Sequence, residues 1–186
     1  PRKRFLVLIP AHNEGAVIAD LLRNLFQMRY PRELFHVVVI ADNCADDTAD
    51  AARKEGATVL ERFSAGAGGK GKALQWALDQ LPRSDDAVAV FDADNRVHLD
   101  FLQKANDALC AGHPLLQGFL GTKNPNDNWL TRVLHLHQVS INVLWHAGKH
   151  GLGMGNYLVG TGMVIDRRLL DAYGWNAMTL TEDLEF

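Results

Sequence analysis

The sequence predicts an α/β domain with a mostly parallel central sheet flanked by helices. Continuous apolar runs such as FLVLIP (residues 5–10) and FHVVVIAD (35–42) are typical of strands buried on both faces of a parallel sheet. Segments with apolar residues at helical spacing lie between these runs, so strand and helix alternate along the chain. With 186 residues, 47% of them hydrophobic, the chain can form one domain with a substantial core.

The elements of the first half follow in order. After the first strand, apolar residues recur at helical spacing from Val17 to Phe26, with Asn13 as the expected cap and Tyr30-Pro31 as the end. After the second strand, we expect Asp46 or Asp47 to cap a helix that closes near Gly56. Four further elements are predicted: a weaker strand (58–63), a helix (72–81), a strong strand (87–94) and a helix (99–109).

The second half has a less regular pattern. It predicts a long helix (130–145), a glycine-rich loop (148–155), a strand (157–165) and a short helix from Arg167. The sequence begins on PRKR directly before a strand and stops at LTEDLEF within a pattern. We therefore expect residues 1–186 to be a single domain that belongs to a longer protein and is truncated at its C-terminus.

Composition excludes some classes of partner. The net charge of −3 gives no electrostatic reason to expect nucleic-acid binding. The two cysteines, Cys44 and Cys110, lie far apart without zinc-site spacing and are expected to be reduced thiols. No apolar run reaches the ~18–20 residues that span a bilayer.

The stretch GAGGKGKA (66–73) fits two phosphate-binding patterns. Its glycines match G-x-G-x-x-G, but the preceding segment is charged, whereas a dinucleotide fingerprint follows a buried strand. Asp92, 21 positions after Gly71, keeps a Rossmann-type dehydrogenase as an alternative. The match to G-x-x-x-x-G-K fails because Ala73 replaces the hydroxyl that binds magnesium.

Two lysines of this stretch, Lys70 and Lys72, lie at the start of a predicted helix. The helix dipole disfavours cations at that end, so the lysines are explained if an anion binds between them. A solvated loop is the alternative.

The segment FDADN (91–95) follows the strong strand. On an extended chain Asp92 and Asp94 would project to one side and could hold Mg²⁺ or Mn²⁺ bridging to a diphosphate. A simple turn and helix cap is the alternative. A D-x-D-x-T/V phosphatase motif is excluded because Arg96 occupies its fifth position and the segment follows the fourth strand.

Other strand ends also carry polar groups. Asp42 ends the second strand, and Pro10-Ala11-His12-Asn13-Glu14 ends the first. The carboxyl ends of parallel strands share one edge, where ligands bind in open α/β sheets. So many acidic groups at one edge require compensation by a metal or by cationic side chains.

Six motifs in this order, LIPAHNE, VIADNCADDT, GKGKAL, FDADN, GTGMVIDRR and LTEDLEF, resemble those of family-two inverting glycosyltransferases. The resemblance covers roughly residues 5–186 and is to the processive or membrane-bound group that includes cellulose and poly-N-acetylglucosamine synthases. It implies a GT-A fold, a nucleotide-sugar donor that is usually UDP-linked, and a glycan or lipid acceptor. It further implies a cytoplasmic site in a parent protein attached to a membrane.

The same resemblance implies the roles of individual residues. Pro10, Ala11, His12, Glu14 and Asp42 would hold the uridine, Lys72 would lie near the diphosphate, Asp92 near ribose and metal, and Asp94 on the metal. Gly160, Thr161, Gly162 and Glu182 would border the sugar and acceptor, and Asp183 would be the catalytic base. The family's Gln-x-x-Arg-Trp motif is not reached before Phe186, so processivity cannot be inferred. A non-catalytic nucleotide-sugar-binding domain remains the alternative from another class.

Overall fold

The computed structural model describes residues 1–65, 69–154 and 158–175. Its strands are β1 (Phe5–Ala11), β2 (Phe35–Asp42), β3 (Thr58–Arg62), β4 (Ala87–Val90), β5 (Leu115–Gln117) and β6 (Met163–Asp166). Its α-helices are α1 (Gly15–Phe26), α2 (Thr48–Lys54), α3 (Lys70–Gln80), α4 (Phe101–Cys110), α5 (Trp129–Ser140), α6 (Ala147–Gly151) and α7 (Arg167–Tyr173). A 3-10 helix, η1 (Arg32–Leu34), precedes β2, and a π-helical segment, η2 (Ile141–His146), joins α5 to α6.

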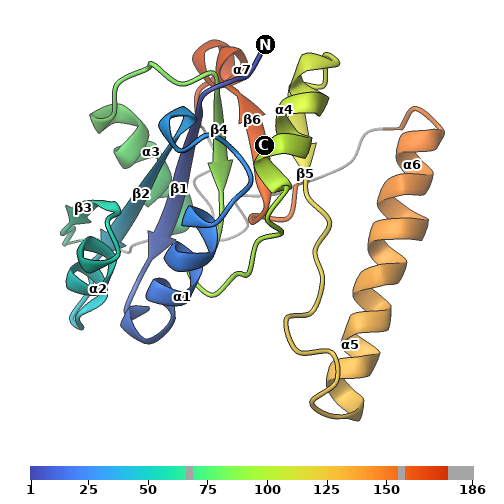
Figure 1. Ribbon diagram of the computed structural model, residues 1–186, viewed down its shortest axis with the longest axis horizontal. Helices are drawn as coiled ribbons and strands as arrows, with labels where there is room; N and C mark the ends of the chain where they lie inside the picture. The colour runs from blue at the N-terminus through green and yellow to red at the C-terminus, as the bar shows by residue number, and fades with distance from the viewer. Residues whose placement is uncertain (66–68, 155–157, 176–186) are drawn as a thin grey trace.

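The strands form one six-stranded sheet in the order β3-β2-β1-β4-β6-β5 (Figure 1). The strands β1 to β4 are parallel to one another, whereas β6 runs antiparallel between β4 and β5. From β1 the chain builds outward through β2 to β3 and then returns to the other side of β1 as β4. The strand order therefore reverses between β1 and β4, and such a switch point opens a crevice at the carboxyl ends of the strands.

The sheet is buried on both faces, as the apolar runs predict. Alternate residues of β1 enter opposite core clusters: Phe5, Val7 and Ile9 on one face, Leu6 and Leu8 on the other. Residues of α1, α2 and α4 pack on the first face, and residues of α3 and α7 pack on the second (Figure 1). Both faces of the central strands are thus sequestered from water, which leaves only the sheet edges and strand ends for polar chemistry.

The strands of the second half differ from the prediction. The expected strand at 157–165 is the shorter β6, and β5 was not predicted from the sequence. In β5, Leu115 is exposed and the other two residues are only partly buried, so the strand gives no alternating pattern. Their pairing with β6 depends on contacts distant in sequence, which periodicity does not report.

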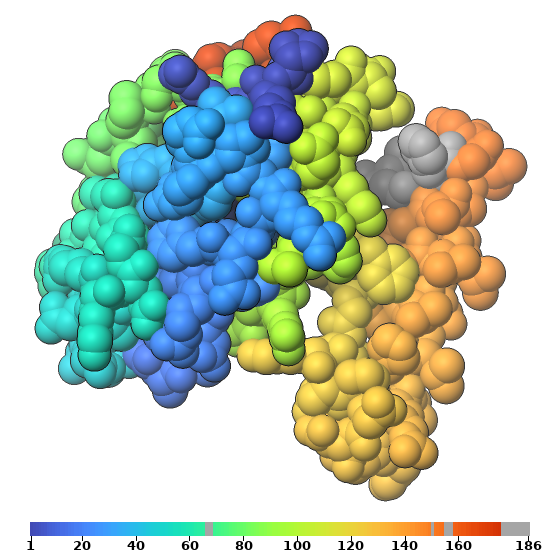
Figure 2. All heavy atoms as spheres, in the orientation of Figure 1, coloured from blue at the N-terminus to red at the C-terminus, as the bar shows by residue number. Residues whose placement is uncertain are grey.

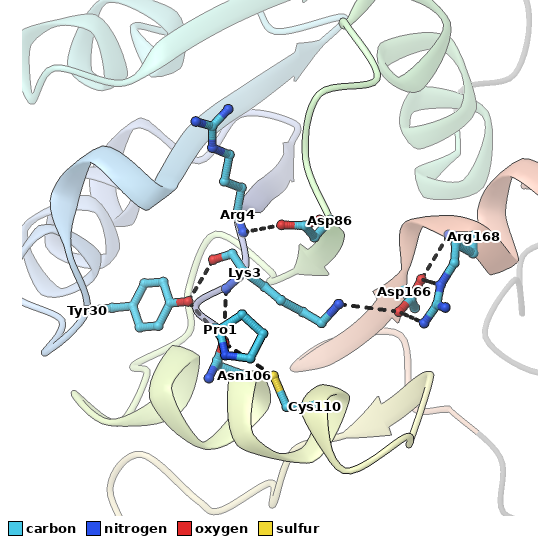
Figure 3. A network of polar contacts seen from close by, with 9 residues as sticks. All are labelled: Pro1, Lys3, Arg4, Tyr30, Asp86, Asn106, Cys110, Asp166 and Arg168. Atoms are coloured by element: carbon cyan, nitrogen blue, oxygen red, sulfur yellow. Dashed lines mark hydrogen bonds and ion pairs between the residues drawn. The ribbon is translucent and has the colours of Figure 1, made fainter.

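A polar network fixes the residues that precede β1 (Figure 3). The Tyr30 hydroxyl donates to the Lys3 carbonyl at 2.6 Å, and the Lys3 amide donates to Asn106 Oδ1 at 2.9 Å. The Lys3 ammonium lies 4.0 Å from Asp166, which also accepts hydrogen bonds from the backbone and guanidinium of Arg168. The network joins the start of the chain to α4 and to the end of β6.

Asp166 should make the stability of the protein depend on pH. Its side chain is 2% exposed, and the hydrogen bonds from Arg168 lower its pKa below the ordinary value. A depressed folded-state pKa contributes stability above the unfolded pKa, and that stability is lost as the pH falls through the folded value. Asp166→Asn should therefore cost about 1–2 kcal/mol of unfolding free energy near neutral pH and much less in acid.

Urea unfolding of the unaltered protein and of Asp166→Asn, at about pH 7 and about pH 3, measures the cost of the substitution at each pH. Asp171→Asn is the matched control, because Asp171 lies on the adjacent α7 with its side chain 44% exposed. An equal cost for Asp166→Asn at both pH values would contradict the assignment.

Candidate functional site

A cavity of about 440 Å³ opens at the switch point between β1 and β4. Its walls come from the ends of β1 and β2, the start of α3 and the segment after β4. The lining residues are Pro10, Ala11, His12, Glu14, Asp42, Asn43, Gly69, Lys70, Ala73 and Asp92. Six of the seven residues expected at the nucleotide therefore line one cavity, and Lys72 is the exception.

The loop after β1 is held by the loop after β2. His12 Nδ1 lies 2.7 Å from the Asp42 carbonyl, and Asn13 Oδ1 accepts from the Ala45 amide at 2.8 Å. Asn13 was expected to cap α1, but the N-cap is Glu14, and the Gly15 amide donates to Asp46 Oδ2 at 3.0 Å. Asn13 is left-handed, with φ 57°, so its side chain bridges the two loops instead.

Asp42 forms an ion pair that the sequence did not reveal. Arg62 Nη1 donates to Asp42 Oδ1 at 2.7 Å, and both side chains are largely buried. The two residues face each other in the parallel register of β2 and β3. The charged residues of the weak third strand were the only signal in the sequence. This pair supplies part of the charge compensation that the acidic edge requires.

Lys70 enters the cavity from the first turn of α3. Its ammonium donates to Asp92 Oδ1 at 2.5 Å and also to the Gly160 carbonyl. The helix begins at residue 70, two residues before the predicted start, so Lys70 and Ala73 lie on one face and both line the cavity. Lys72 is exposed and lies on another side of α3. Lys70, and not the expected Lys72, is therefore the lysine that lines the cavity.

Asp92 and Asp94 do not project to the same side, because β4 ends at Val90 and residues 92–95 form a turn. The Asn95 amide donates to the Asp92 carbonyl at 3.1 Å. Asp92 lines the first cavity, whereas exposed Asp94 lines a second cavity of about 500 Å³. The two cavities therefore meet at this turn, with one carboxylate on each side of it.

The segment before β6 is hydrogen-bonded to the turn at which the two cavities meet. The Asp92 amide donates to Thr161 Oγ1 at 3.0 Å, the Thr161 hydroxyl bonds Asn95, and the Gly162 amide donates to the Val90 carbonyl at 2.8 Å. Gly162 has φ 64°, a conformation that a side chain would strain, and it lines the second cavity. The structure thus brings Thr161 next to Asp92, and the expected role of Gly160, Thr161 and Gly162 beside the sugar and acceptor stays a prediction.

The second cavity has a mixed wall of aromatic and polar groups. Its lining includes the apolar side chains of Phe91, Phe101, Phe119 and Leu120 and the polar ones of Asp94, Asn95, Arg96 and Lys123. A third cavity, of about 420 Å³ and more apolar, shares Phe101 and Phe119 and continues beneath α4. Glu182 and Asp183, expected at the acceptor and as base, lie outside the described residues.

Metal binding can be assessed from the donor groups. Within residues 1–65, 69–154 and 158–175, no three His, Cys, Asp or Glu side chains gather closely enough to hold an ion by themselves. Asp92 and Asp94 offer hard carboxylate oxygens, which suit Mg²⁺ or Mn²⁺, and such ions commonly complete their shell with substrate phosphates and water. The residues fit an ion that binds together with a phosphorylated ligand.

The arrangement defines an α/β domain with an open crevice at a sheet switch point, bordered by an acidic turn. The family model described as "Glycosyltransferase like family 2" matches residues 1–186, and the chain belongs to this family. The chain is 33% identical over 193 residues to a beta-monoglucosyldiacylglycerol synthase of Trichormus variabilis, covering 96% of this chain and 39% of that protein. It therefore spans about two fifths of this curated relative.

Solved structures show the same fold. The mannosyltransferase PcManGT from Pyrobaculum calidifontis, in complex with GDP-Man and Mn²⁺, superposes with a TM-score of 0.63 at 22% identity, covering 94% of this chain and 47% of that chain. Glucosyl-3-phosphoglycerate synthase from Mycobacterium tuberculosis, with Mn²⁺, UDP and glucosyl-3-phosphoglycerate, superposes with a TM-score of 0.61 at 22% identity, covering 90% and 58%. The expected GT-A fold is confirmed, and the expected membership of a glycosyltransferase family is confirmed by the family model.

Proposed function

We propose that this protein transfers a sugar from a UDP-linked sugar donor to an acceptor hydroxyl in a metal-dependent reaction that inverts the anomeric centre. The observation that carries the proposal is the cavity at the β1/β4 switch point, into which Lys70 and Asp92 project beside the turn that bears Asp94. Relatives with GDP-Man and UDP in their complexes support a nucleotide donor.

The nucleoside would occupy the part of the cavity between the ends of β1 and β2. Pro10 and Ala11 contribute apolar lining to this part, and Asp42 and His12 contribute polar atoms. Arg62 and the Asp42 carboxylate hold each other in place, so Asp42 can accept hydrogen bonds from a base without reorientation. The choice of UDP over GDP in this proposal rests on the resemblance to the family.

The diphosphate would lie at the N-terminus of α3, where backbone amides and the helix dipole favour anions. Lys70 is the cation that the structure places there, and it would exchange its contact with Asp92 for the phosphates. A divalent ion held by Asp94, close to Asp92 and with phosphate oxygens completing its shell, would neutralise charge on the departing diphosphate. Lys70 adds to that stabilisation from the opposite side of the turn.

The acceptor would enter from the second cavity, across the turn from the nucleotide. Single displacement requires a base on the face of the sugar opposite the leaving group, and the acceptor hydroxyl loses its proton to that base as it attacks. Asp183 is assigned this role through the T-E-D motif, with Glu182 beside the acceptor. We place the reaction on the cytoplasmic side of a membrane-attached parent protein, which agrees with the free thiols of Cys44 and Cys110.

A panel of nucleotides tests the proposal by thermal unfolding. UDP, GDP, UDP-sugars and NAD are each added with and without Mn²⁺. Protection by a uridine nucleotide that requires Mn²⁺ supports the proposed donor site, whereas protection by NAD alone indicates a dehydrogenase. Release of free sugar or transfer to an acceptor then separates an enzyme from a non-catalytic binding domain.

Asp94→Asn should weaken UDP binding in the presence of Mn²⁺ and leave metal-free binding unchanged. Asparagine keeps the volume of the side chain but removes the charge that attracts the ion. Because Asp94 is exposed, the fold should be unaffected. Titration with UDP, with and without Mn²⁺, measures the effect, and Asp127→Asn, a change at another exposed aspartate, is the control. Full retention of the Mn²⁺ effect in Asp94→Asn would remove Asp94 from the metal site.

A further inference from the structure

The segment α5–η2–α6 has an apolar face directed away from the rest of the protein. It forms a column beside the body, and the space-filling view shows open space between its lower part and the domain (Figures 1 and 2). Large apolar side chains on this column are 50–75% exposed. They are Trp129, Leu130, Val133, Leu134, Leu136, Val143, Leu144 and Trp145.

The side of the column with the half-buried residues is mostly polar. These residues recur at helical spacing and include Thr131, His135, Gln138, Asn142, His146 and Lys149. Asn142 joins the column to the body, since its Nδ2 donates to the Leu120 carbonyl at 2.7 Å and its Oδ1 accepts from the Leu120 amide at 3.3 Å. A surface helix usually turns its apolar face to the protein core and its polar face to water, whereas this column does the opposite.

An exposed apolar patch of this extent marks an interaction surface. Its charge indicates the kind of partner. The sequence has no Asp or Glu between Asp127 and Asp166, although the whole chain has 22 acidic residues and a net charge of −3. The same stretch contains Arg132, Lys149 and four histidines. The column thus carries basic and no acidic side chains, with Arg132 exposed beside the apolar residues, and this charge favours an anionic partner.

The length of the column and its exposed tryptophans favour a lipid surface over a protein as the partner. From residue 129 to 151 the column measures roughly 35 Å at 1.5 Å per residue. Among the described residues, no helix is long and apolar enough to cross a membrane. The exposed tryptophans, Trp129 and Trp145, lie on the apolar side, and the Lys149 ammonium lies 4.7 Å from the centroid of the Trp145 ring. Helices that lie in the membrane interface combine these features: an apolar face with tryptophan and leucine, bordered by cations.

We propose that α5, η2 and α6 dock the protein onto the surface of a bilayer that contains anionic lipids, with the apolar face at the boundary of the headgroups and acyl chains. The proposal stands without the transfer reaction, because binding to vesicles requires neither donor nor acceptor.

Co-sedimentation with vesicles tests it. The chain is mixed with vesicles of phosphatidylcholine alone, or of phosphatidylcholine with phosphatidylglycerol. We expect binding to both kinds and tighter binding to the anionic mixture. The double variant Leu136→Glu/Leu144→Glu should bind at least about tenfold more weakly, because binding scales with the buried apolar area. Phe63→Glu is the matched control, since Phe63 is 73% exposed but follows β3 at the far edge of the sheet.

A charge variant separates the electrostatic contribution to vesicle binding from the apolar contribution. Arg132→Gln should weaken binding to the anionic vesicles about fivefold and leave binding to phosphatidylcholine alone unchanged. Circular dichroism confirms that each variant is folded. The proposal is overturned if the wild-type chain binds neither kind of vesicle, or if Phe63→Glu loses as much binding as the double variant. It is also overturned if sedimentation without lipid shows a dimer that the double variant abolishes, because a second copy then covers the face.

Discussion

Changing Asp183 to asparagine is expected to lower the rate of sugar transfer by about 10²–10⁴-fold, the usual loss when a general base is removed. Donor affinity should stay near normal, because the base acts on the acceptor hydroxyl and not on the nucleotide. The variant separates chemistry from binding and so tests the proposed single displacement. Since this chain spans about two fifths of its curated relative, the test is best made in the longer parent protein.

UDP affinity and transfer are measured on the same preparation. Glu182→Gln is the matched control, because it neutralises the adjacent carboxylate of the same motif. Transfer that survives within a factor of a few in Asp183→Asn would require another base, and Glu182 would be the first candidate. A parallel collapse of donor affinity would assign Asp183 to the donor site or to the fold.

Lys70→Met should weaken UDP binding by about tenfold to a hundredfold and leave uridine binding unchanged, because a charge-assisted contact with phosphate is worth about 1.5–3 kcal/mol. Lys72→Met is the control that the structure provides. Both lysines belong to the first turn of α3, but only Lys70 lines the cavity. Calorimetric titration of both variants with UDP and with uridine measures the difference.

The opposite outcome would change which lysine is assigned to the phosphates. If Lys72→Met weakened UDP binding and Lys70→Met did not, the sequence-based preference for Lys72 would be correct and α3 would have to rotate when the donor binds. If both ligands lost affinity equally in Lys70→Met, the effect would come from Asp92, whose partner is removed, and not from the phosphate.

The buried strands could be predicted because burial on both faces leaves an unbroken apolar run. The runs at 5–10 and 35–42 correspond to β1 and β2, and the order of the chain places their carboxyl ends at one edge. Hence the cavity residues Pro10, His12, Asp42 and Asp92 were predictable as a group. That these residues bind a nucleotide sugar was inferred from the order of the motifs.

Other features depend on a register or on a boundary of one or two residues. The Asp42–Arg62 ion pair needs the alignment of β2 with β3, and the inward position of Lys70 needs the true start of α3. The divergence of Asp92 from Asp94 follows from the end of β4 at Val90, several residues before the apolar pattern ends. Periodicity does not fix such boundaries, so these details required the structure.

The central claim is that the cavity between β1, β2 and β4 holds the nucleotide of the donor. A crystal structure of the chain grown with UDP and Mn²⁺ tests it most directly. We expect uridine between Pro10 and Asp42, the diphosphate within hydrogen-bond distance of Lys70, and the ion on Asp94 or Asp92. Nucleotide bound elsewhere, for example in the cavity lined by Phe119, or an ion with no contact to either aspartate, would contradict it.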